Sequence, residues 1–470
     1  MQNKDKVTFL DILGGIVITI LILLCLGSLV FLILYIFNLN GETNILSLNP
    51  ITITFLVLLF IGLVLVSVMA VGFIRENKKE VVMPTIIEPQ VINKKETKKE
   101  DKKEKTGKRF QKLDLLDKKY PGTKQTKIKS LEGLTLPYLC ERFRYFAASD
   151  ETNPLYYSIE DIRRFISSLG VSKTLILQGM SGTGKTSLPL AFGRFIKNTT
   201  SVVPIQPMWK EKSDLLGYYN EFTDRFNEST ILEKIYEANK VDKLFIIILD
   251  ELNIARVEYY FSEFLSLLEL KKDEERVLEV TSLISNEDPE MFDHGKIRIP
   301  NNIWFIGTAN NDDSTFAISD KVYDRAMIMN LDQRCEDFTP EEDNEEIDIS
   351  LGVFEELINK AQREYSLTRR GRERLGEFDK YIQNTFGITF GNRIKRQIDA
   401  YVPIYIACGG NEIEALDDML SKKVLRKLES QNPVYVKNKS NELIAKLNEI
   451  FGSGNMKNSI DYITKMTRNG

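Results

Sequence analysis

The sequence has almost no histidine and no closely spaced cysteines. His294 is the one histidine, so a histidine-based catalytic triad or a multi-histidine zinc site has too few candidates, and we interpret His294 as a loop residue. Cys25, Cys140, Cys335 and Cys408 lie far apart without a CxxC pair. The last three are typical of reduced thiols rather than of a disulfide framework. The formal net charge is only −4, so no global field marks the chain as a nucleic-acid binder.

Two long apolar runs without charge stand near the N-terminus. Ile12–Phe37 has 26 residues and Ile51–Ile74 has 24, and each exceeds the ~20 residues that cross a bilayer as a helix. A pair of buried core helices is the alternative, but successive helices that are apolar on every side are unusual in a globular core. The pattern predicts a two-helix transmembrane hairpin in residues 1–75.

The charges that flank these runs predict a topology. The connector Asn38–Pro50 contains Glu42 but no lysine or arginine, whereas Arg75 and nearby lysines follow the second run. Lysine and arginine accumulate on the cytoplasmic side of a membrane. We therefore expect a multi-pass protein of the cell membrane that contacts the lipid bilayer through two spans, with both termini and the domain after the spans in the cytoplasm.

Residues 76–130 are rich in lysine and glutamate, and Lys94–Arg109 is their most charged part. Nothing apolar recurs there at a regular spacing, which predicts a disordered linker. A solvated tether is the simpler interpretation. A segment that binds anionic lipid or nucleic acid is the alternative.

The strongest motif is a complete G-x-x-x-x-G-K-[ST] pattern from Gly179 to Thr186. The apolar run Thr174–Gln178 predicts a strand before it and Ser187–Ile196 predicts a helix after it, which is the context that a P-loop requires. Lys185 is expected to reach the β and γ phosphates, and the Thr186 hydroxyl to bind Mg²⁺. The predicted nucleotide-binding residues are Gly179, Met180, Ser181, Gly182, Thr183, Gly184, Lys185, Thr186 and Ser187.

A second apolar run, Leu244–Leu249, ends in Asp250 and Glu251. Continuous apolar runs are typical of parallel strands that are buried on both faces, and ligands bind at the carboxyl ends of such strands. Asp250 is therefore predicted to hold the Mg²⁺ shell, and Glu251 to polarise the attacking water.

A third strand-like run, Ile303–Thr308, leads to Asn310, whose amide is placed to orient the water. This order of P-loop strand, acidic strand and Asn-ended strand resembles the AAA+ ATPases. The resemblance implies an α/β fold, in which a parallel sheet flanked by helices is followed by an α-helical lid. It implies that Asn310 is the first sensor residue and that Arg325 is an arginine finger acting on a neighbouring subunit. It also implies that Arg393 is the second sensor residue, with Arg396, one helical turn further on, as the alternative. An arginine finger in turn implies self-association into a ring, and a hexamer is expected.

Four further stretches narrow the resemblance, namely Trp209–Tyr219, Asp250–Asn253, Phe261–Glu269 and Gly307–Asp313. They resemble the dynein-related and MoxR-like branch, and are most similar to the McrB-like nucleotidase subunits of modified-DNA restriction systems. McrB-like motors are associated with GTP through an Asn-x-x-Asp motif, whose polar positions match Asn310 and Asp313. Those proteins read DNA through a separate N-terminal domain, whose place is taken here by the two apolar runs, so direct DNA binding is not expected. Trp209–Tyr219 has two interpretations, a loop that binds a substrate or partner, and aromatic side chains that pack against a helix.

The sequence as a whole predicts five segments. They are a transmembrane hairpin (1–75), a disordered linker (76–130), an AAA+ nucleotide-binding domain (131–335), a helical lid (336–430) and a C-terminal helical extension (431–470). The helices predicted in the lid are Leu351–Glu364, Arg369–Thr385, Arg393–Cys408 and Glu412–Leu428. We expect a membrane-anchored enzyme that hydrolyses ATP with Mg²⁺ to remodel or activate a partner protein. The alternatives are a GTPase that acts with a nuclease partner in defence, a nucleotide-gated membrane assembly, and a scaffold without turnover. Intact Lys185, Glu251 and Arg325 argue against the scaffold.

Overall fold

The computed structural model describes residues 109–122, 133–285, 287–310, 315–332, 335–340 and 345–469. Both apolar runs near the N-terminus, and the linker before residue 109, lie outside these ranges. Within the described ranges no helix is long and apolar enough to cross a membrane. This finding overturns the predicted localisation, which was a multi-pass membrane protein with a cytoplasmic nucleotide-binding domain.

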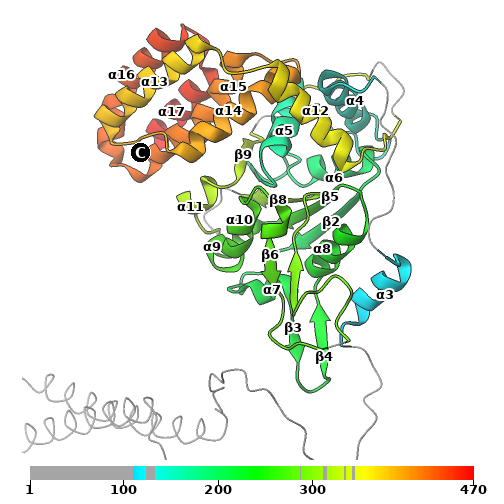
Figure 1. Cartoon of the computed structure of the whole chain (residues 1–470). Coiled ribbons are helices and arrows are strands. Elements are labelled where there is room, and N and C mark those ends of the chain that lie inside the picture. The colour runs from blue at the N-terminus through cyan, green and yellow to red at the C-terminus, as the bar shows by residue number, and fades with distance from the viewer. Residues whose placement is uncertain are drawn as a thin grey trace, which may run out of the picture. The chain divides into compact units, whose positions relative to one another are not determined.

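A five-stranded parallel sheet forms the centre of the nucleotide-binding part, in the order β2-β5-β8-β1-β9. Its strands are apolar because helices cover both faces, as Figure 1 shows. β1 lies between β8 and β9, with Ile176 opposite both Gly307 and Ile328. The carboxyl ends of neighbouring strands therefore meet at one edge. The strands are β1 Thr174–Gln178, β2 Thr199–Pro204, β5 Phe245–Asp250, β8 Ile303–Ala309 and β9 Met327–Asn330.

Alternate side chains of these strands point into two separate hydrophobic cores. Leu175 and Leu177 belong to one core and Ile176 to the other, as the period of two along a strand requires. Both faces of the sheet are therefore covered, and these two layers hold the carboxyl ends of the strands, which carry the site, in place. Helices α4 Leu136–Ala148, α5 Ile159–Val171 and α6 Ser187–Phe195 line the first core, and α8 Thr230–Lys240, α9 Val257–Tyr260 and α10 Ser262–Leu268 line the second.

Helix α5, which leads into β1, shows how the sequence sets these contacts. Ser158 caps it by accepting the Asp161 N–H at 3.1 Å, which satisfies a backbone donor that the first turn leaves free. Its apolar residues recur at the spacing of one helical face, so that face is buried against the sheet and the lid. The residues are Ile162, Phe165, Ile166 and Leu169.

The chain after the sheet is helical, and Figure 1 shows these helices beside α5. We call α12–α15 and the two short helices after them the lid. The helix predicted over Leu351–Glu364 is confirmed. The helix predicted over Glu412–Leu428 is broken by a π-helix, which lets the consecutive residues Lys422 and Lys423 both reach buried acceptors. The bounds are α12 Leu351–Glu364, α13 Arg369–Phe386, α14 Asn392–Ala407, α15 Glu412–Met419, the π-helix η3 Leu420–Val424, the 3-10 helix η4 Leu425–Ser430, α16 Pro433–Phe451 and α17 Lys457–Asn469.

Short elements extend from the second face of the sheet. Trp209, which the sequence left between a partner-binding loop and internal packing, lies edge-on to Tyr260 with ring centroids 5.9 Å apart. This contact supports the packing interpretation. The short elements are the hairpins β3 Gly217–Asn220 with β4 Arg225–Glu228 and β6 Val277–Glu279 with β7 Lys296–Arg298, and the helices α7 Lys212–Leu216, η1 Leu252–Ile254, η2 Asp273–Glu275 and α11 Asp320–Tyr323.

The end of the predicted linker is folded, which corrects the prediction of disorder for that part of residues 76–130. Helix α3 covers Gln111–Lys119, and Phe110 before it is buried. The Phe110 ring lies 4.9 Å from that of Phe226 in β4 and 5.0 Å from that of Phe292. The prediction failed because Phe110 and the buried Leu113 supply apolar contacts that the surrounding lysine-rich composition concealed.

We expect Phe110→Ala to lower the free energy of unfolding by about 3–5 kcal/mol, because it leaves a cavity between two aromatic rings. Chemical denaturation followed by circular dichroism measures the change. Leu115 of α3 is 62% exposed. Leu115→Ala is therefore the matched control and should lower the free energy of unfolding by no more than about 0.5 kcal/mol. Equal losses for the two variants would contradict the docking of α3.

Candidate functional site

The P-loop follows β1 directly, and close approaches require two of its glycines. Gly179 has φ +151°, and a Cβ there would lie 2.4 Å from the carbonyl oxygen of Leu331. Gly184 has φ +85°, and a Cβ there would lie 2.8 Å from the Tyr157 hydroxyl. That hydroxyl donates to the Gly184 carbonyl at 3.1 Å, and burial raises the pKa of Tyr157, so it stays a donor. The loop is held in place from both sides.

Lys185 lies inside the P-loop. Its side chain is buried, and its Nζ donates to the carbonyl of Gly179 at 2.9 Å and to that of Met180 at 2.6 Å. An ammonium group enclosed by this loop, at the N-terminus of α6, favours an anionic ligand. The predicted nucleotide-binding residues form this loop, except for Ser187, which is the first residue of α6. Met180, Ser181 and Gly182 are exposed, whereas Thr183, Gly184, Thr186 and Ser187 are half-buried.

The two predicted Mg²⁺ ligands are brought together. Thr186 Oγ1 donates to Asp250 Oδ1 at 2.9 Å, and Thr308 Oγ1 donates to the same oxygen at 2.7 Å. Mg²⁺ prefers oxygen ligands, and at sites shared with phosphates it takes only one or two from the protein. The described residues contain no group of three or more His, Cys, Asp or Glu side chains that could hold a metal ion. Thr186 and Asp250 therefore fit a Mg²⁺ ion that nucleotide brings with it.

Glu251 has an unusual backbone conformation at the end of β5. Its φ of 53° and ψ of 46° are left-handed, a region that residues other than glycine seldom occupy. Its N–H donates to Thr308 Oγ1 at 2.9 Å, so Thr308 links Glu251 to Asp250. Such strain is concentrated at sites where a side chain must be aimed at a ligand. The exposed Glu251 side chain thus fits the role of a general base.

We expect Thr308→Val to lower Mg²⁺-dependent turnover about 10-fold, because it leaves the Glu251 N–H without its acceptor and an unsatisfied buried group costs about 1–3 kcal/mol. Steady-state phosphate release across a Mg²⁺ titration measures the effect. Thr464→Val is the matched control, since its hydroxyl bonds only a carbonyl of its own helix, α17, at 2.8 Å. Wild-type turnover in Thr308→Val would refute the role of this threonine.

Asn310 lies at the carboxyl end of β8, beside the acidic strand. Its carbonyl accepts from Asn253 Nδ2 at 2.9 Å and from Thr315 Oγ1 at 3.2 Å. Asn253 is buried and also donates to the Phe316 carbonyl at 3.3 Å, so it ties together the two described ends of the loop after β8. Its Oδ1 is buried without a hydrogen-bond partner among the described residues. Asp313, the other position of the predicted GTP motif, lies outside the described residues.

Arg325 and Arg393 share one carboxylate. Arg393 Nε lies 2.6 Å from Glu269 Oε1, and Arg325 Nε lies 3.6 Å from Glu269 Oε2. Arg325 also donates to the Ser266 hydroxyl. The two guanidinium groups therefore meet at the end of α10. Their side chains and that of Glu269 are 29% to 38% exposed, so an approaching anion can reach them.

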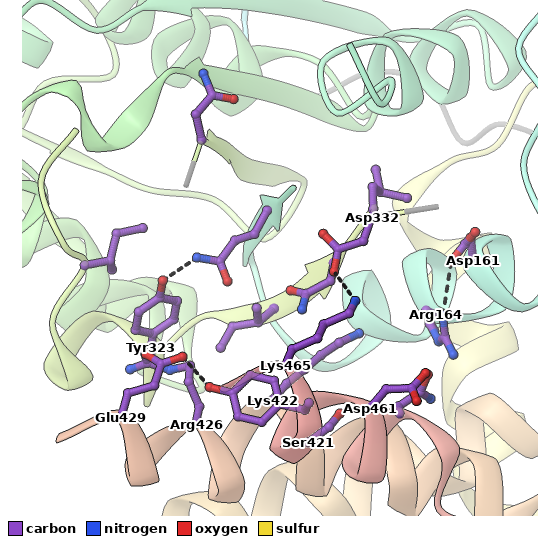
Figure 2. A pocket seen from close by; sticks show the side chains of 18 of the residues that line it. Asp161, Arg164, Tyr323, Asp332, Ser421, Lys422, Arg426, Glu429, Asp461 and Lys465 are labelled. Carbon is purple, nitrogen blue, oxygen red and sulfur yellow. Dashed lines mark hydrogen bonds and ion pairs between the residues drawn. The ribbon is translucent and has the colours of Figure 1, made fainter. Parts of the chain in front are cut away.

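A cavity of about 870 Å³ opens between the sheet edge and the helices after it, within the size range of small-molecule sites. Its lining includes Gln178, the residue before the P-loop, and Asn310. On the side of the helices it includes Lys422 and Lys465, which Figure 2 labels. Asp332 and Lys465 form an ion pair in it at 3.9 Å. This mixture of cations and carboxylates suits a charged, polar ligand.

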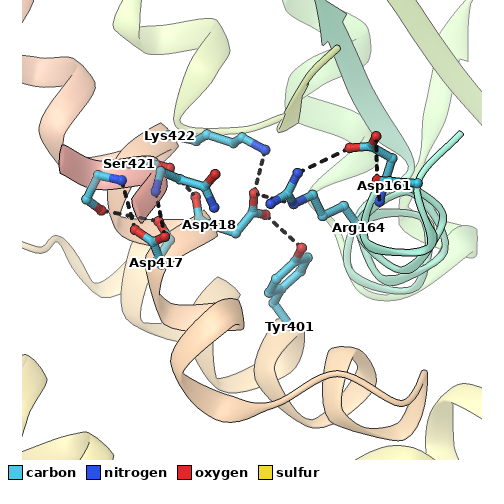
Figure 3. Close-up of polar contacts among 10 residues, drawn as sticks. Asp161, Arg164, Tyr401, Asp417, Asp418, Ser421 and Lys422 are labelled. Atoms are coloured by element: carbon cyan, nitrogen blue, oxygen red, sulfur yellow. Dashed lines mark hydrogen bonds and ion pairs between the residues drawn. The ribbon is translucent and has the colours of Figure 1, made fainter. Parts of the chain in front are cut away.

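A buried ionic network joins the lid to α5 beside this cavity (Figure 3). Asp418 lies 2.5 Å from Lys422 Nζ and 3.3 Å from Arg164 Nε, and it accepts from the Tyr401 hydroxyl at 2.7 Å. Arg164 also pairs with Asp161 at 3.2 Å. Burial on its own raises the pKa of Asp418, but Lys422 and Arg164 outweigh it and hold the pKa below its usual value. The ionised carboxylate therefore fixes the lid to the helix that precedes the P-loop strand.

Comparison with known proteins agrees with this geometry. Residues 174–326 match the AAA domain of the dynein-related subfamily, and residues 346–470 match a domain of unknown function, DUF8727. The sheet order, the P-loop and this match agree with each other, and residues 174–326 resemble an AAA+ nucleotide-binding domain of the P-loop class.

This chain is similar to a relative of known name and to solved structures. The chain is 26% identical over 182 residues to the EcoKMcrB subunit of the Type IV methyl-directed restriction enzyme of Escherichia coli (strain K12). The aligned region covers 37% of this chain and 38% of that protein. The chain thus spans well under half of that relative. A crystal structure of an inferred ATPase from Cytophaga hutchinsonii matches with a TM-score of 0.43 and 12% identity, over 66% of this chain and 93% of that one.

Several residues at the site were not singled out by sequence reasoning. Thr308 lies one residue before the end of β8, and its hydroxyl reaches Asp250 only because β8 and β5 are neighbours. A polar residue near the end of an otherwise apolar strand was the available signal. Glu269 and Tyr157 carry no such signal, since their partners are brought to them by tertiary packing.

Proposed function

We propose that this chain hydrolyses ATP with Mg²⁺. The observation that carries the proposal is the convergence of Lys185, Thr186 and Asp250 at one sheet edge, with the last two joined at 2.9 Å. Lys185 binds β- and γ-phosphate oxygens, and Thr186 and Asp250 hold the Mg²⁺ ion, which neutralises phosphate charge when bound. Glu251 accepts the proton of the attacking water, and Asn310 orients that water.

The proposal includes assembly into a ring, with six subunits as the expected number. Arg325 acts as an arginine finger on nucleotide in the neighbouring subunit, where it neutralises charge in the transition state. Arg393 is the candidate for the second sensor residue. Glu269 pairs with both arginines, and the phosphates of bound nucleotide compete with its carboxylate for them. The partial exposure of all three side chains supports this exchange of ionic partners.

The work done by hydrolysis is proposed to be the remodelling or activation of a partner protein. The similar Escherichia coli protein is a subunit of a restriction enzyme, which supports a nuclease as the partner here. This likeness also supports a second candidate, a GTPase that acts with such a nuclease, because Asn310 stands at the first position of the Asn-x-x-Asp motif.

Phosphate release by the full chain, with ATP and GTP compared in the presence of Mg²⁺, tests the proposal. Lys185→Ala is the control, because it removes the cation that binds phosphate, and light scattering confirms that the protein is assembled. ATP-preferred turnover that Lys185→Ala abolishes would support the first proposal, and a clear GTP preference would support the second. No turnover of either nucleotide by assembled protein would refute both.

A further inference from the structure

The turn that presents Arg325 is held by the lid. It consists of α11 and the three residues after it, Asp320–Ala326, and it lies just before β9. Lys423 of the π-helix is buried, and its Nζ donates to the carbonyl of Tyr323 at 2.7 Å and to that of Ala326. These two carbonyls flank Arg325 in sequence, so a single ammonium group clamps the backbone on both sides of the arginine.

Three more lid side chains contact the same turn. Gln397 of α14 donates to the Asp324 carbonyl at 3.2 Å. Lys427 lies 3.5 Å from the Asp324 carboxylate. Arg426 pairs with Asp320, and its guanidinium carbon lies 3.3 Å from the centre of the Tyr323 ring. Four lid side chains thus hold this one turn, through its backbone and through its side chains.

Tyr323 also connects the turn to the P-loop strand. The Gln178 side chain donates to the Tyr323 hydroxyl, and Gln178 is the last residue of β1, immediately before Gly179. Tyr323 is buried, and burial raises its pKa, so the hydroxyl remains protonated. Tyr323 therefore contacts the P-loop strand through its hydroxyl, Arg426 of the lid through its ring, and Lys423 of the lid through its backbone carbonyl.

We propose that Lys423 is a positioning residue for Arg325, which makes the arginine finger move with the lid of its own subunit. The proposal rests on the proposed hydrolysis and deepens it. A lid that shifts when nucleotide is bound or released carries the Asp320–Ala326 turn with it and changes how Arg325 meets the neighbouring subunit's nucleotide. The hydrogen bond between Gln178 and Tyr323 links the position of the P-loop strand to the position of the same turn.

The chemistry of Lys423 supports a role beyond packing. Burying an ammonium group is costly, and burial lowers the pKa of Lys423 to about 7. An apolar side chain of similar length would fill the same space without that cost. What the lysine adds is two directed hydrogen bonds to the carbonyls of Tyr323 and Ala326, which its nitrogen can donate in either the protonated or the neutral form.

The test uses Lys423→Met in the full chain, since methionine keeps the length and loses the donors. A displacement of about 1 Å at a catalytic group costs about 100-fold in rate, so we expect turnover to fall about 100-fold while affinity for a fluorescent ATP analogue stays within twofold. Lys423→Arg retains donors and is expected to recover at least part of the loss. Lys446→Met is the matched control, because this lysine of α16 pairs with Glu377 and Glu449 instead, and its turnover should equal that of wild type.

Mixing subunits separates positioning from a general structural role. A Lys423→Met subunit has an intact P-loop, and a Lys185→Ala subunit has an intact arginine finger. Mixed rings should therefore turn over more nucleotide than either variant alone. Wild-type turnover by Lys423→Met would overturn the proposal, and so would a loss that mixing with Lys185→Ala fails to rescue.

A second variant serves if Lys423→Met does not fold. Gln397→Ala removes one half-buried hydrogen bond to the turn and is expected to lower turnover about fivefold, equivalent to one hydrogen bond of about 1 kcal/mol, with the same rescue on mixing. Unchanged turnover in a folded Gln397→Ala variant would then count against the proposal. If wild type itself has no turnover, hydrolysis fails. If Arg325→Ala lowers turnover but Lys423→Met leaves it at the wild-type rate, the proposed hydrolysis stands and only the positioning role of Lys423 fails.

Discussion

Replacing Arg325 with alanine is expected to lower nucleotide turnover by about 10³- to 10⁵-fold, the range typical of an arginine finger. The reason is electrostatic, because the guanidinium group neutralises charge that develops on the transferred phosphoryl group. Nucleotide affinity should change little, since each subunit keeps its own Lys185 and Thr186. Phosphate release at saturating ATP and GTP, together with equilibrium binding of a fluorescent analogue, measures the two quantities separately.

The control for this variant is Arg363→Ala, on the exposed side of α12, which should turn over nucleotide at the wild-type rate. Rings that mix Arg325→Ala with Lys185→Ala subunits should regain activity, because each variant supplies what the other lacks. Turnover within threefold of wild type in Arg325→Ala would show that this arginine is a surface residue held by Glu269.

Glu251→Gln is expected to lower turnover by about 10²- to 10⁴-fold, the usual contribution of a general base. Glutamine keeps the shape of the side chain but cannot accept the proton of the attacking water. Binding should persist, so the variant should accumulate nucleotide-bound rings. Phosphate release and gel filtration with ATP and Mg²⁺ measure both effects.

The matched control is Glu263→Gln, a carboxylate on α10 that pairs with Lys212 at 3.0 Å and lies outside the P-loop edge. It should retain full turnover. Parallel loss of binding and turnover in Glu251→Gln would indicate that the substitution disturbs the left-handed backbone at this position instead of removing a base.

The sheet edge was predictable because its signals are local. β1, β5 and β8 each read as a continuous apolar run followed at once by the polar residues of a motif, and the observed strands Thr174–Gln178, Phe245–Asp250 and Ile303–Ala309 agree with those runs to within one residue. Parallel strands place their carboxyl ends together, so the meeting of Thr186 with Asp250 followed from the pattern.

The contacts that hold the arginines were not predictable, because they join segments far apart in sequence. Glu269 and Arg393 are separated by 124 positions, and Lys423 and Tyr323 by 100. No periodicity marks these residues, and a lysine in a helix usually faces solvent. The folding of α3 was missed for the opposite reason, since the average composition of residues 76–130 outweighed two apolar side chains.

The contacts of Arg109 and Phe110 attach the start of α3 to one face of the sheet. The Arg109 carbonyl accepts from the Phe226 N–H at 3.0 Å, and Phe110 is held between Phe226 and Phe292, all within the second of the two cores. The lid packs against the first core, on the other face of the sheet. Phe110 and the lid therefore pack on opposite faces of the same sheet, so a displacement of either one is expected to reach the other through the strands.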